Sequence, residues 1–295
     1  MSGALAHVGP NMPIDLLRAT GRHAGPLPFN PDRPTPIADG WMESKFAPWA
    51  RSILESWAAG DYDHLDQVVF SRAEDSVQRL YYYLCELQRR GLVAGPQALI
   101  LDIAKIPRES SLARTTDCLR ALAGELGVDG ATLVPAIEQC NRERDHSPPA
   151  RAERACLLCG TPQPDERLYG AIEQSGFAPV GQTLHQTWAA LGPRVELAEN
   201  DPFAALGKQV HVSPDTPRAF VDAGAQLRAE IAACDPQTVV LWQIEEDESQ
   251  AWHLPAQRAA LADSGLPTLV MTRRDWLARD GAADEIGLFL QGIGQ

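Results

Sequence analysis

The residues of this sequence best placed for acid–base chemistry are carboxylates that follow two predicted strands. Glu74 and Asp75 come after the strand at 67–70, and Glu245 comes after the strand at 238–243. Two carboxylates that share a site shift each other's pKa, so such a pair can act as general acid and base or bind a divalent ion. The structural alternative assigns Asp75 to capping the helix that it begins, and the acidic run after Glu245 to a solvated loop.

A second candidate is the C-x-x-C pair Cys156 and Cys159, which has the spacing of zinc and thioredoxin-type sites. The pair lies inside an apolar strand at 155–159, where residues three apart point to opposite faces of a sheet. We therefore predict two buried thiols rather than a chelate. The remaining cysteines are expected to pack within helices or at a helix end, and they are Cys85, Cys118, Cys140 and Cys234.

Other catalytic signatures do not occur in the sequence, which has no G-x-S-x-G elbow, Walker A loop, H-E-x-x-H or G-x-G-x-x-G motif. Its seven histidines are scattered along the chain. Those near predicted element ends, His185 and His253, are interpreted as surface or capping residues rather than catalysts.

Continuous apolar strands alternate with amphipathic helical patterns, which predicts an α/β fold with parallel sheets covered on both faces. In the first half, strands are expected at 67–70 and 98–103 and helices at 13–20, 48–57, 74–90, 111–126 and 131–145. In the second half, strands are expected at 155–159, 178–181, 238–243 and 267–272 and helices at 164–175, 201–209, 216–233 and 252–264. A polar linker at 145–153 predicts two α/β domains, each with a parallel sheet flanked by helices: an N-terminal domain with helical extensions, 1–150, and a C-terminal domain, 151–295.

Ligands of open parallel sheets bind beyond the carboxyl ends of the strands. The segments at those ends are 71–75, 103–105, 160–163 and 243–247, and the cleft between the two domains is where they are expected to meet. The side chains and backbone predicted to bind substrate there are those of Ser71, Asp75, Gly160, Thr161, Gln163 and Gln243. Glu74 and Glu245 are the candidate catalytic residues, and no residue is assigned to a metal.

Composition limits the classes of partner. The 295 residues carry 26 basic and 39 acidic side chains, a formal charge of −13, which argues against nucleic acid or an anionic membrane as partner. The first ten residues have no basic and apolar signal-peptide pattern, and the apolar runs are far shorter than a membrane span. We expect a cytoplasmic protein with free thiols.

Several weak motifs occur in order along nearly the whole chain. Residues 12–21 are similar to a P-x-E-L-[IL]-x-A-x-G signature, 47–54 to C-P-[FY]-x-R-S-x-L, and 70–81 to a strand followed by C-D-S-x-R-x-L-Y. Residues 136–144 are similar to an A-I-x-x-x-N-x-x-R helix, and 158–160, 192–194 and 239–261 fit the same pattern's second domain. Together these segments resemble the B/C-type subunits of the 2-hydroxyacyl-CoA dehydratase and benzoyl-CoA reductase family. The resemblance implies two α/β domains facing across a cleft, paired subunits and a separate ATP-dependent activator that supplies electrons.

The departures from the family pattern concern its iron–sulfur cluster, which three cysteines hold. Residue by residue, the positions of those cysteines align with Ala47, Glu74 and Glu245. Alanine offers no donor atom and such clusters need thiolates, so we expect no cluster in this chain. The late Q-x-x-[TS]-R motif is also lost, with Glu285 near the place of its arginine, and the helical insert between the domains is missing.

The resemblance therefore favours a cluster-less, shortened dehydratase-like subunit, a lyase component that itself binds no cofactor. It would be the non-redox partner of a homologous subunit carrying a [4Fe-4S] cluster, and would help to shape an acyl-CoA-type pocket in a hetero-oligomer. Two alternatives stay open. The chain is an enzyme of different chemistry that uses Glu74 and Glu245 in the inter-domain cleft, or it is a non-enzymatic scaffold or sensor subunit.

Overall fold

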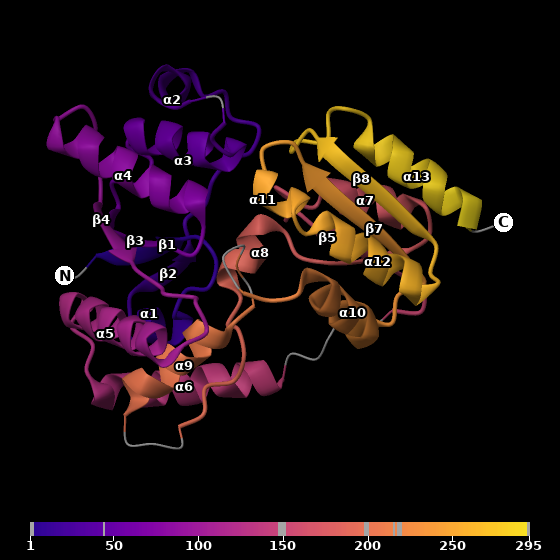
Figure 1. The fold of residues 1–295 in the computed structure, drawn as a ribbon. Coiled ribbons are helices and arrows are strands. Elements are labelled where there is room, and N and C mark those ends of the chain that lie inside the picture. The colour runs from indigo at the N-terminus through magenta and orange to yellow at the C-terminus, as the bar shows by residue number, and fades with distance from the viewer. Residues whose placement is uncertain are drawn as a thin grey trace. The chain divides into compact units, whose positions relative to one another are not determined.

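The computed structural model describes residues 3–43, 45–146, 152–197, 201–214, 216 and 220–293. The chain forms two compact units. Unit 1 is Met1–Ser147 with Trp188–Phe220, and unit 2 is Pro148–Thr187 with Val221–Gln295. Each contains a four-stranded, all-parallel sheet flanked by helices, which confirms the predicted fold class (Figure 1).

The sheet of unit 1 has the strand order β2-β1-β3-β4. Its strands are β1 (Ala4–Val8), β2 (His23–Pro26), β3 (Leu65–Ser71) and β4 (Gln97–Leu101). The first strand of the chain, β1, is thus an inner strand of the sheet. The chain adds β2 on one side of β1 and then β3 and β4 on the other side. The strand order changes direction between β1 and β3, which is the point where α/β sheets of this kind place ligands.

Helices cover both faces of this sheet. Their bounds are α1 (Ile14–Ala19), α2 (Pro36–Trp41), α3 (Pro48–Ala58), α4 (Asp75–Arg89), α5 (Glu109–Leu126), α6 (Gly130–Asp145) and α9 (Pro202–Val212). Figure 1 shows α3 and α4 on one face and α1 and α5 on the other, with α6 and α9 beyond them. The second face has a continuous apolar core that joins Leu5 of β1 to α1, α5, α6 and α9 through fully buried leucines. Burial of this core supplies the main stabilisation of unit 1.

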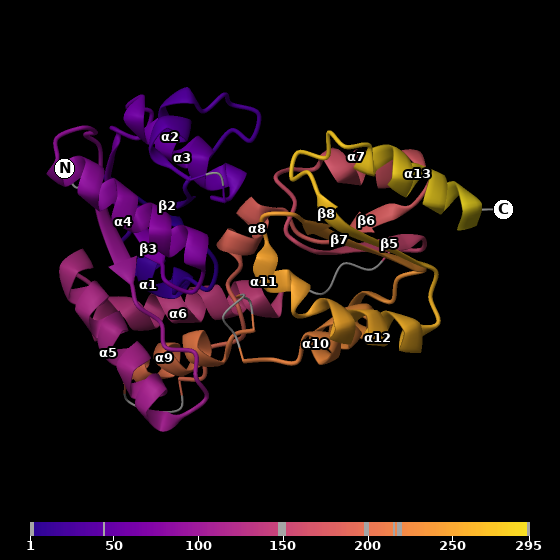
Figure 2. The ribbon, with the colours of Figure 1, turned by 45° about the horizontal axis from the view of Figure 1, so that its top comes forward.

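The sheet of unit 2 repeats the arrangement in the order β6-β5-β7-β8. Its strands are β5 (Ala155–Gly160), β6 (Ala178–Val180), β7 (Thr238–Ile244) and β8 (Thr268–Arg274). Its helices are α7 (Arg167–Gln174), α10 (Ala223–Cys234), α11 (Glu248–Ala251), α12 (Leu254–Ser264) and α13 (Ala282–Ile293). In Figure 2, α7 and α13 lie together on one face, and α10 and α12 lie together on the other. All seven residues of β7 are buried, as expected for a central parallel strand.

Local sequence signals fix several helix boundaries. Helix α5 ends at Gly127, whose left-handed φ of +72° is a conformation that glycine adopts without strain. Helix α6 follows directly and begins with a capping box, in which Asp129 accepts a hydrogen bond from the Thr132 N–H at 2.9 Å and Thr132 Oγ1 accepts one from the Asp129 N–H. The sharp turn between the two helices therefore has a defined chemical cause.

The predicted element list is wrong at the N-terminus. Strands β1 and β2 lie in a stretch for which the sequence predicts only the helix at 13–20 and no strand. The segment Ala4–Val8 is short, contains a histidine and lacks β-branched residues except its last, so its local propensity for a strand is weak. Its burial between β2 and β3 decides its structure.

Residues 188–220 group with unit 1, whereas the sequence analysis assigned everything after 151 to the second domain. Helix α9 packs on α5 and α6, and Gly207 permits the close approach, because a Cβ there would overlap the Thr116 hydroxyl. Helix α8 (Leu184–Ala189) spans the point where the chain leaves unit 2. The predicted linker falls partly on 147–151, outside the described residues.

Within the described ranges, no helix has the length and hydropathy needed to cross a membrane.

Candidate functional site

The residues predicted at the end of β3 form a tight turn into α4. Ser71 is fully buried, and its Oγ accepts a hydrogen bond from the Ala73 N–H at 3.1 Å. Glu74 occupies the N-cap position of α4 in an extended conformation and is half-buried, but its side chain makes no capping hydrogen bond. Asp75 is the first residue of α4 and is exposed, in the first turn where the helix dipole favours a carboxylate.

Two of the three positions that the resemblance would assign to cluster ligands lie at helix N-termini of unit 1. Ala47 is the N-cap residue of α3 and is 9% exposed, and Glu74 is the N-cap residue of α4. The neighbour of Ala47, Phe46, lies against α4: its ring is 5.1 Å from that of Tyr83 and 4.1 Å from the Arg79 guanidinium carbon. The side chains at these positions are a methyl group and a carboxylate, neither of which supplies the thiolate that an iron–sulfur cluster needs.

At the end of β5, the chain passes very close to β7. Gly160 has φ +103°, and a Cβ there would overlap the Trp242 carbonyl oxygen. The next N–H, that of Thr161, donates to the same carbonyl at 2.8 Å. Thr161 Oγ1 donates to Asp247 Oδ2 at 3.3 Å and accepts from the Ile244 N–H at 3.4 Å. The predicted binding residues Gly160 and Thr161 thus close this end of the sheet.

The two predicted glutamines of unit 2 are also buried. Gln243 is 4% exposed, and its amide donates to Gln257 Oε1 at 3.1 Å and to the Gln250 carbonyl at 3.4 Å. Gln163 is 1% exposed, and its backbone carbonyl accepts from the Leu184 N–H at 2.8 Å. The buried Oε1 of Gln163 has no hydrogen-bond partner among the described residues. Binding of substrate by these residues stays a prediction.

Glu245 is 63% exposed and pairs with the Arg273 guanidinium at 2.8 Å; Arg273 is itself 80% exposed. The carboxylate also raises the pKa of Arg273 through this hydrogen bond. Glu245 belongs to unit 2 and Glu74 to unit 1, and each is described within its own unit. The use of these two residues as an acid–base pair stays a prediction.

The C-x-x-C pair lies on β5 as predicted. Cys159 packs with Leu157 in the core beneath α10 and α12, so Cys156, an odd number of residues away, points to the other face. Burial raises the pKa of Cys156 to about 12 and that of Cys159 well above its usual range. Because metals and electrophiles react with the thiolate, both groups are held in their inert form. Within the described ranges, no three His, Cys, Asp or Glu side chains form a metal-binding group.

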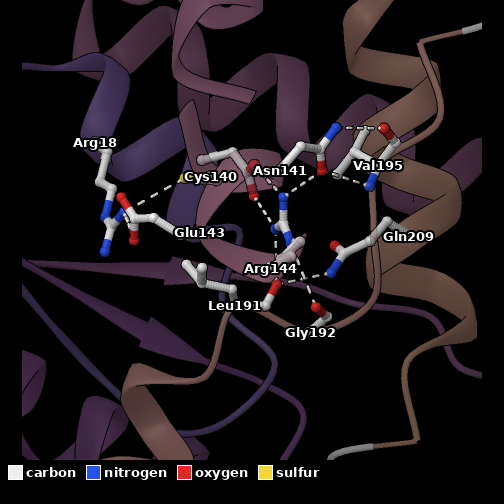
Figure 3. Close-up of polar contacts among 10 residues, drawn as sticks. Arg18, Cys140, Asn141, Glu143, Arg144, Leu191, Gly192, Val195 and Gln209 are labelled. Carbon is white, nitrogen blue, oxygen red and sulfur yellow. Dashed lines mark hydrogen bonds and ion pairs between the residues drawn. The ribbon is translucent and has the colours of Figure 1, made fainter. Parts of the chain in front are cut away.

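The most extensive polar network of unit 1 is centred on Arg144 in the last turn of α6 (Figure 3). All five guanidinium N–H groups of Arg144 are used. Two bind the Asp15 carboxylate in a fork at 2.9 and 2.7 Å, and the others reach Asn141 Oδ1, the Leu191 carbonyl and the Gly192 carbonyl. The Arg144 side chain is 6% exposed and that of Asp15 is 1% exposed. A buried pair with every donor satisfied is a rigid structural link.

Asn141 extends this network, because its side chain both donates a hydrogen bond to the backbone of Val195 and accepts one from it. Its amide donates to the Val195 carbonyl at 2.8 Å, and its Oδ1 accepts from the Val195 N–H at 3.0 Å. The network therefore joins three separate segments that carry the family resemblance: 12–21, 136–144 and 192–194. It also explains why the chain after α8 returns to unit 1.

Lys105, at the carboxyl end of β4, holds the far end of the returning segment. Its ammonium group is buried and donates to the carbonyls of Val210 and Ser213 at 2.8 Å and of His211 at 3.2 Å. These are the last carbonyls of α9, where a cation complements the helix dipole. The role of Lys105 among the described contacts is to fix α9.

A pair of histidines that the sequence analysis did not single out lies on neighbouring strands of unit 1. His7 of β1 is fully buried, and its Nε2 bonds the Trp188 carbonyl at 3.0 Å. Its Nδ1 is 2.9 Å from Nε2 of His23, which begins β2. Because a carbonyl only accepts, Nε2 of His7 is the donor in its hydrogen bond to Trp188. Burial, with Arg18 nearby, lowers the pKa of His23 to about 4.

A cavity of about 230 Å³ lies beside this pair. Its lining includes His7, His23 and Gly25 from the strands, Ile14 and Arg18 from α1, and Ala189. The Arg18 guanidinium donates through Nη1 to Glu143 Oε2 at 2.7 Å and to Cys140 Sγ at 3.6 Å (Figure 3). The cavity thus combines one cation with a hydrogen-bonded imidazole pair. The signal in the sequence was only that His7 and His23 each lie in a short segment able to form a strand.

Comparison of the chain with models of protein families and with curated proteins finds no match.

Proposed function

We propose that this chain is a cluster-less, shortened 2-hydroxyacyl-CoA dehydratase-like subunit, the non-redox partner of a homologous subunit that carries a [4Fe-4S] cluster. In the complex it helps to shape the pocket for an acyl-CoA-type substrate. The proposal places the complex in the cytoplasm, where the six free thiols of the chain stay reduced.

The observation that carries this proposal is the contrast between retained scaffold contacts and lost donor atoms. Asp15, Asn141 and Arg144, each in a segment that resembles the family, meet in one buried network. Two positions that the resemblance assigns to cluster ligands hold Ala47 and Glu74, neither of which offers a thiolate. A scaffold kept while the ligands are replaced supports a role in assembly and substrate shaping rather than in electron transfer.

The proposal is tested by mixing the purified chain with a cluster-bearing homologue and its activator. We expect a stable complex in size-exclusion chromatography, and dehydration of a 2-hydroxyacyl-CoA only when both subunits are present. A matched comparison uses Arg144→Met, which breaks the network and should reduce assembly. Turnover of the substrate by this chain alone, or full activity of the homologue without it, would overturn the proposal.

A further inference from the structure

We propose that the cavity between α1 and the β1–β2 edge of unit 1 binds a small monocarboxylate, which pairs with Arg18 and faces the imidazole of His23. This site goes beyond the proposed function, because it lies within unit 1 and uses none of the positions that correspond to cluster ligands.

The size and position of the cavity fit a small ligand. Its volume of about 230 Å³ is below the range of roughly 300–1,000 Å³ that is usual for drug-sized molecules. It lies at His7, near the carboxyl end of β1, and along the whole length of the edge strand β2, from His23 to Pro26. The apolar part of its lining, from Ile14 and Ala189, suits the short hydrocarbon part of an organic acid.

Arg18 supplies the group that recognises a carboxylate. Both side-chain contacts of Arg18 among the described residues are made by Nη1. The other edge of the guanidinium, formed by Nε and Nη2, presents two parallel N–H donors, the geometry that binds a carboxylate in a fork. The Arg18 side chain is 36% exposed and lines the cavity, so a ligand can reach it without unfolding α1.

The charge of the site favours a monoanion over a dianion. The Arg18 charge is shared with Glu143, whose Oε2 lies 2.7 Å from Nη1, and His23 adds no positive charge at pH 7 because burial, with Arg18 nearby, lowers its pKa to about 4. A phosphate dianion would therefore bring more negative charge than the lining compensates. A monocarboxylate brings a single negative charge.

His23 gives the site a second property, proton uptake on binding. His7 holds Nε2 of His23, so Nδ1 is the atom of the ring that can take a proton. The charged and titratable groups that face His23 are His7 from β1 and Arg18 from α1, with Glu143 of α6 behind Arg18. Burial is the larger cause of the low pKa of His23, and the Arg18 charge adds to it. A bound carboxylate offsets the Arg18 charge, so the pKa of His23 rises and binding tightens as the pH falls.

Isothermal titration of the full chain with acetate, propionate and lactate tests the site, with inorganic phosphate as the competing anion class. We expect saturable binding of a carboxylate, tighter at pH 5.5 than at pH 7.5. Titration in two buffers of different ionisation enthalpy should reveal proton uptake. His23→Asn should bind but lose both the pH dependence and the proton uptake.

Two variants of the same ion pair separate binding from structure. Arg18→Gln removes the fork and should weaken binding about tenfold or more. Glu143→Gln breaks the same ion pair but leaves the guanidinium, and should bind as tightly as the natural chain or more tightly. Equal losses in both variants, no saturable binding of any of the three acids, or tighter binding of phosphate would overturn the proposal.

Discussion

The two units share one strand order and differ in where they use polar side chains. Unit 1 buries a complete Arg144–Asp15 ion pair, the Lys105 ammonium and the His7 imidazole, and has a cavity beside His7 and the half-buried His23. Unit 2 closes its sheet with backbone contacts at Gly160 and Thr161, and its Glu245–Arg273 pair is exposed. One topology therefore accommodates buried charged links beside an apolar core in unit 1, and close backbone packing at the strand ends in unit 2.

Both units join segments that are far apart in the sequence, but they do so through different contacts. Unit 1 gathers segments far apart in the sequence, since Asp15, Arg144 and Leu191 meet in one network. Such segments need directional contacts to fix their register, and a fully satisfied buried network supplies them. In unit 2, β5 and β7 are neighbouring strands of one parallel ladder, and the main contact between their ends is the ladder itself.

The largest expected effect is in the buried network. Arg144→Met leaves the Asp15 carboxylate buried without its partner and should lower the free energy of unfolding by about 3–5 kcal/mol. Urea titration measures the loss, and hydrogen exchange should report it first at 191–195 and α6. The matched control, Arg89→Met, removes an exposed pair with Glu86 at the end of α4 and should leave the free energy of unfolding nearly unchanged. Equal effects would contradict the distinction between buried and exposed links.

The next effect is in the backbone closure of unit 2. Gly160→Ala adds a Cβ against the Trp242 carbonyl at a left-handed φ, and should cost about 2–4 kcal/mol. Gly170→Ala is the control, because Gly170 lies in α7 with open space around it and alanine favours the helix. A small loss in the free energy of unfolding of Gly160→Ala would mean that the pairing of β5 with β7 does not depend on this contact.

A smaller, pH-dependent effect belongs to the histidine pair of unit 1. The pKa of His23 is lowered to about 4 in the folded chain, against 6.5 for the unperturbed group. Between these values the unfolded chain binds a proton that the folded chain does not, so the free energy of unfolding falls as the pH drops from 6.5 to 4, by up to about 3 kcal/mol. Urea titrations at several pH values across this window should show a weaker dependence of the free energy of unfolding on pH for His23→Asn. The variant His64→Asn, at an exposed position, should keep the dependence of the natural chain.

The smallest effect is expected at the exposed pair of unit 2. Glu245→Gln should change the free energy of unfolding by less than about 0.5 kcal/mol, because both side chains of the pair are mostly in water. A loss above about 1 kcal/mol in the same titration would place Glu245 in a stabilising contact beyond Arg273.

The sequence predicts the regular parts of both units well, since apolar periodicity identifies β3, β4 and all four strands of unit 2. Strand β1 escapes prediction because five residues with a histidine carry little local signal, and only pairing with β2 and β3 buries them. The return of 188–220 to unit 1 escapes it for the same kind of reason. It rests on contacts such as that of Asn141 with Val195, which are 54 residues apart.

The candidate site shows the same limit. The rule that ligands bind at strand ends selects Ser71, Gly160 and Thr161 correctly as strand-end residues, but it does not reveal that their polar groups bond to neighbouring backbone. The His7–His23 pair depends on the register between β1 and β2, in which His23 lies opposite Leu5. Neither histidine has a sequence neighbour that would have marked it.

The most direct test of the central claim is the amount of iron and acid-labile sulfide per chain in protein purified under strictly anaerobic conditions. The account predicts values near zero, also after chemical reconstitution, because Ala47 and Glu74 offer no thiolate. Stoichiometric iron and sulfide would contradict it, and would return cluster-dependent chemistry to this chain.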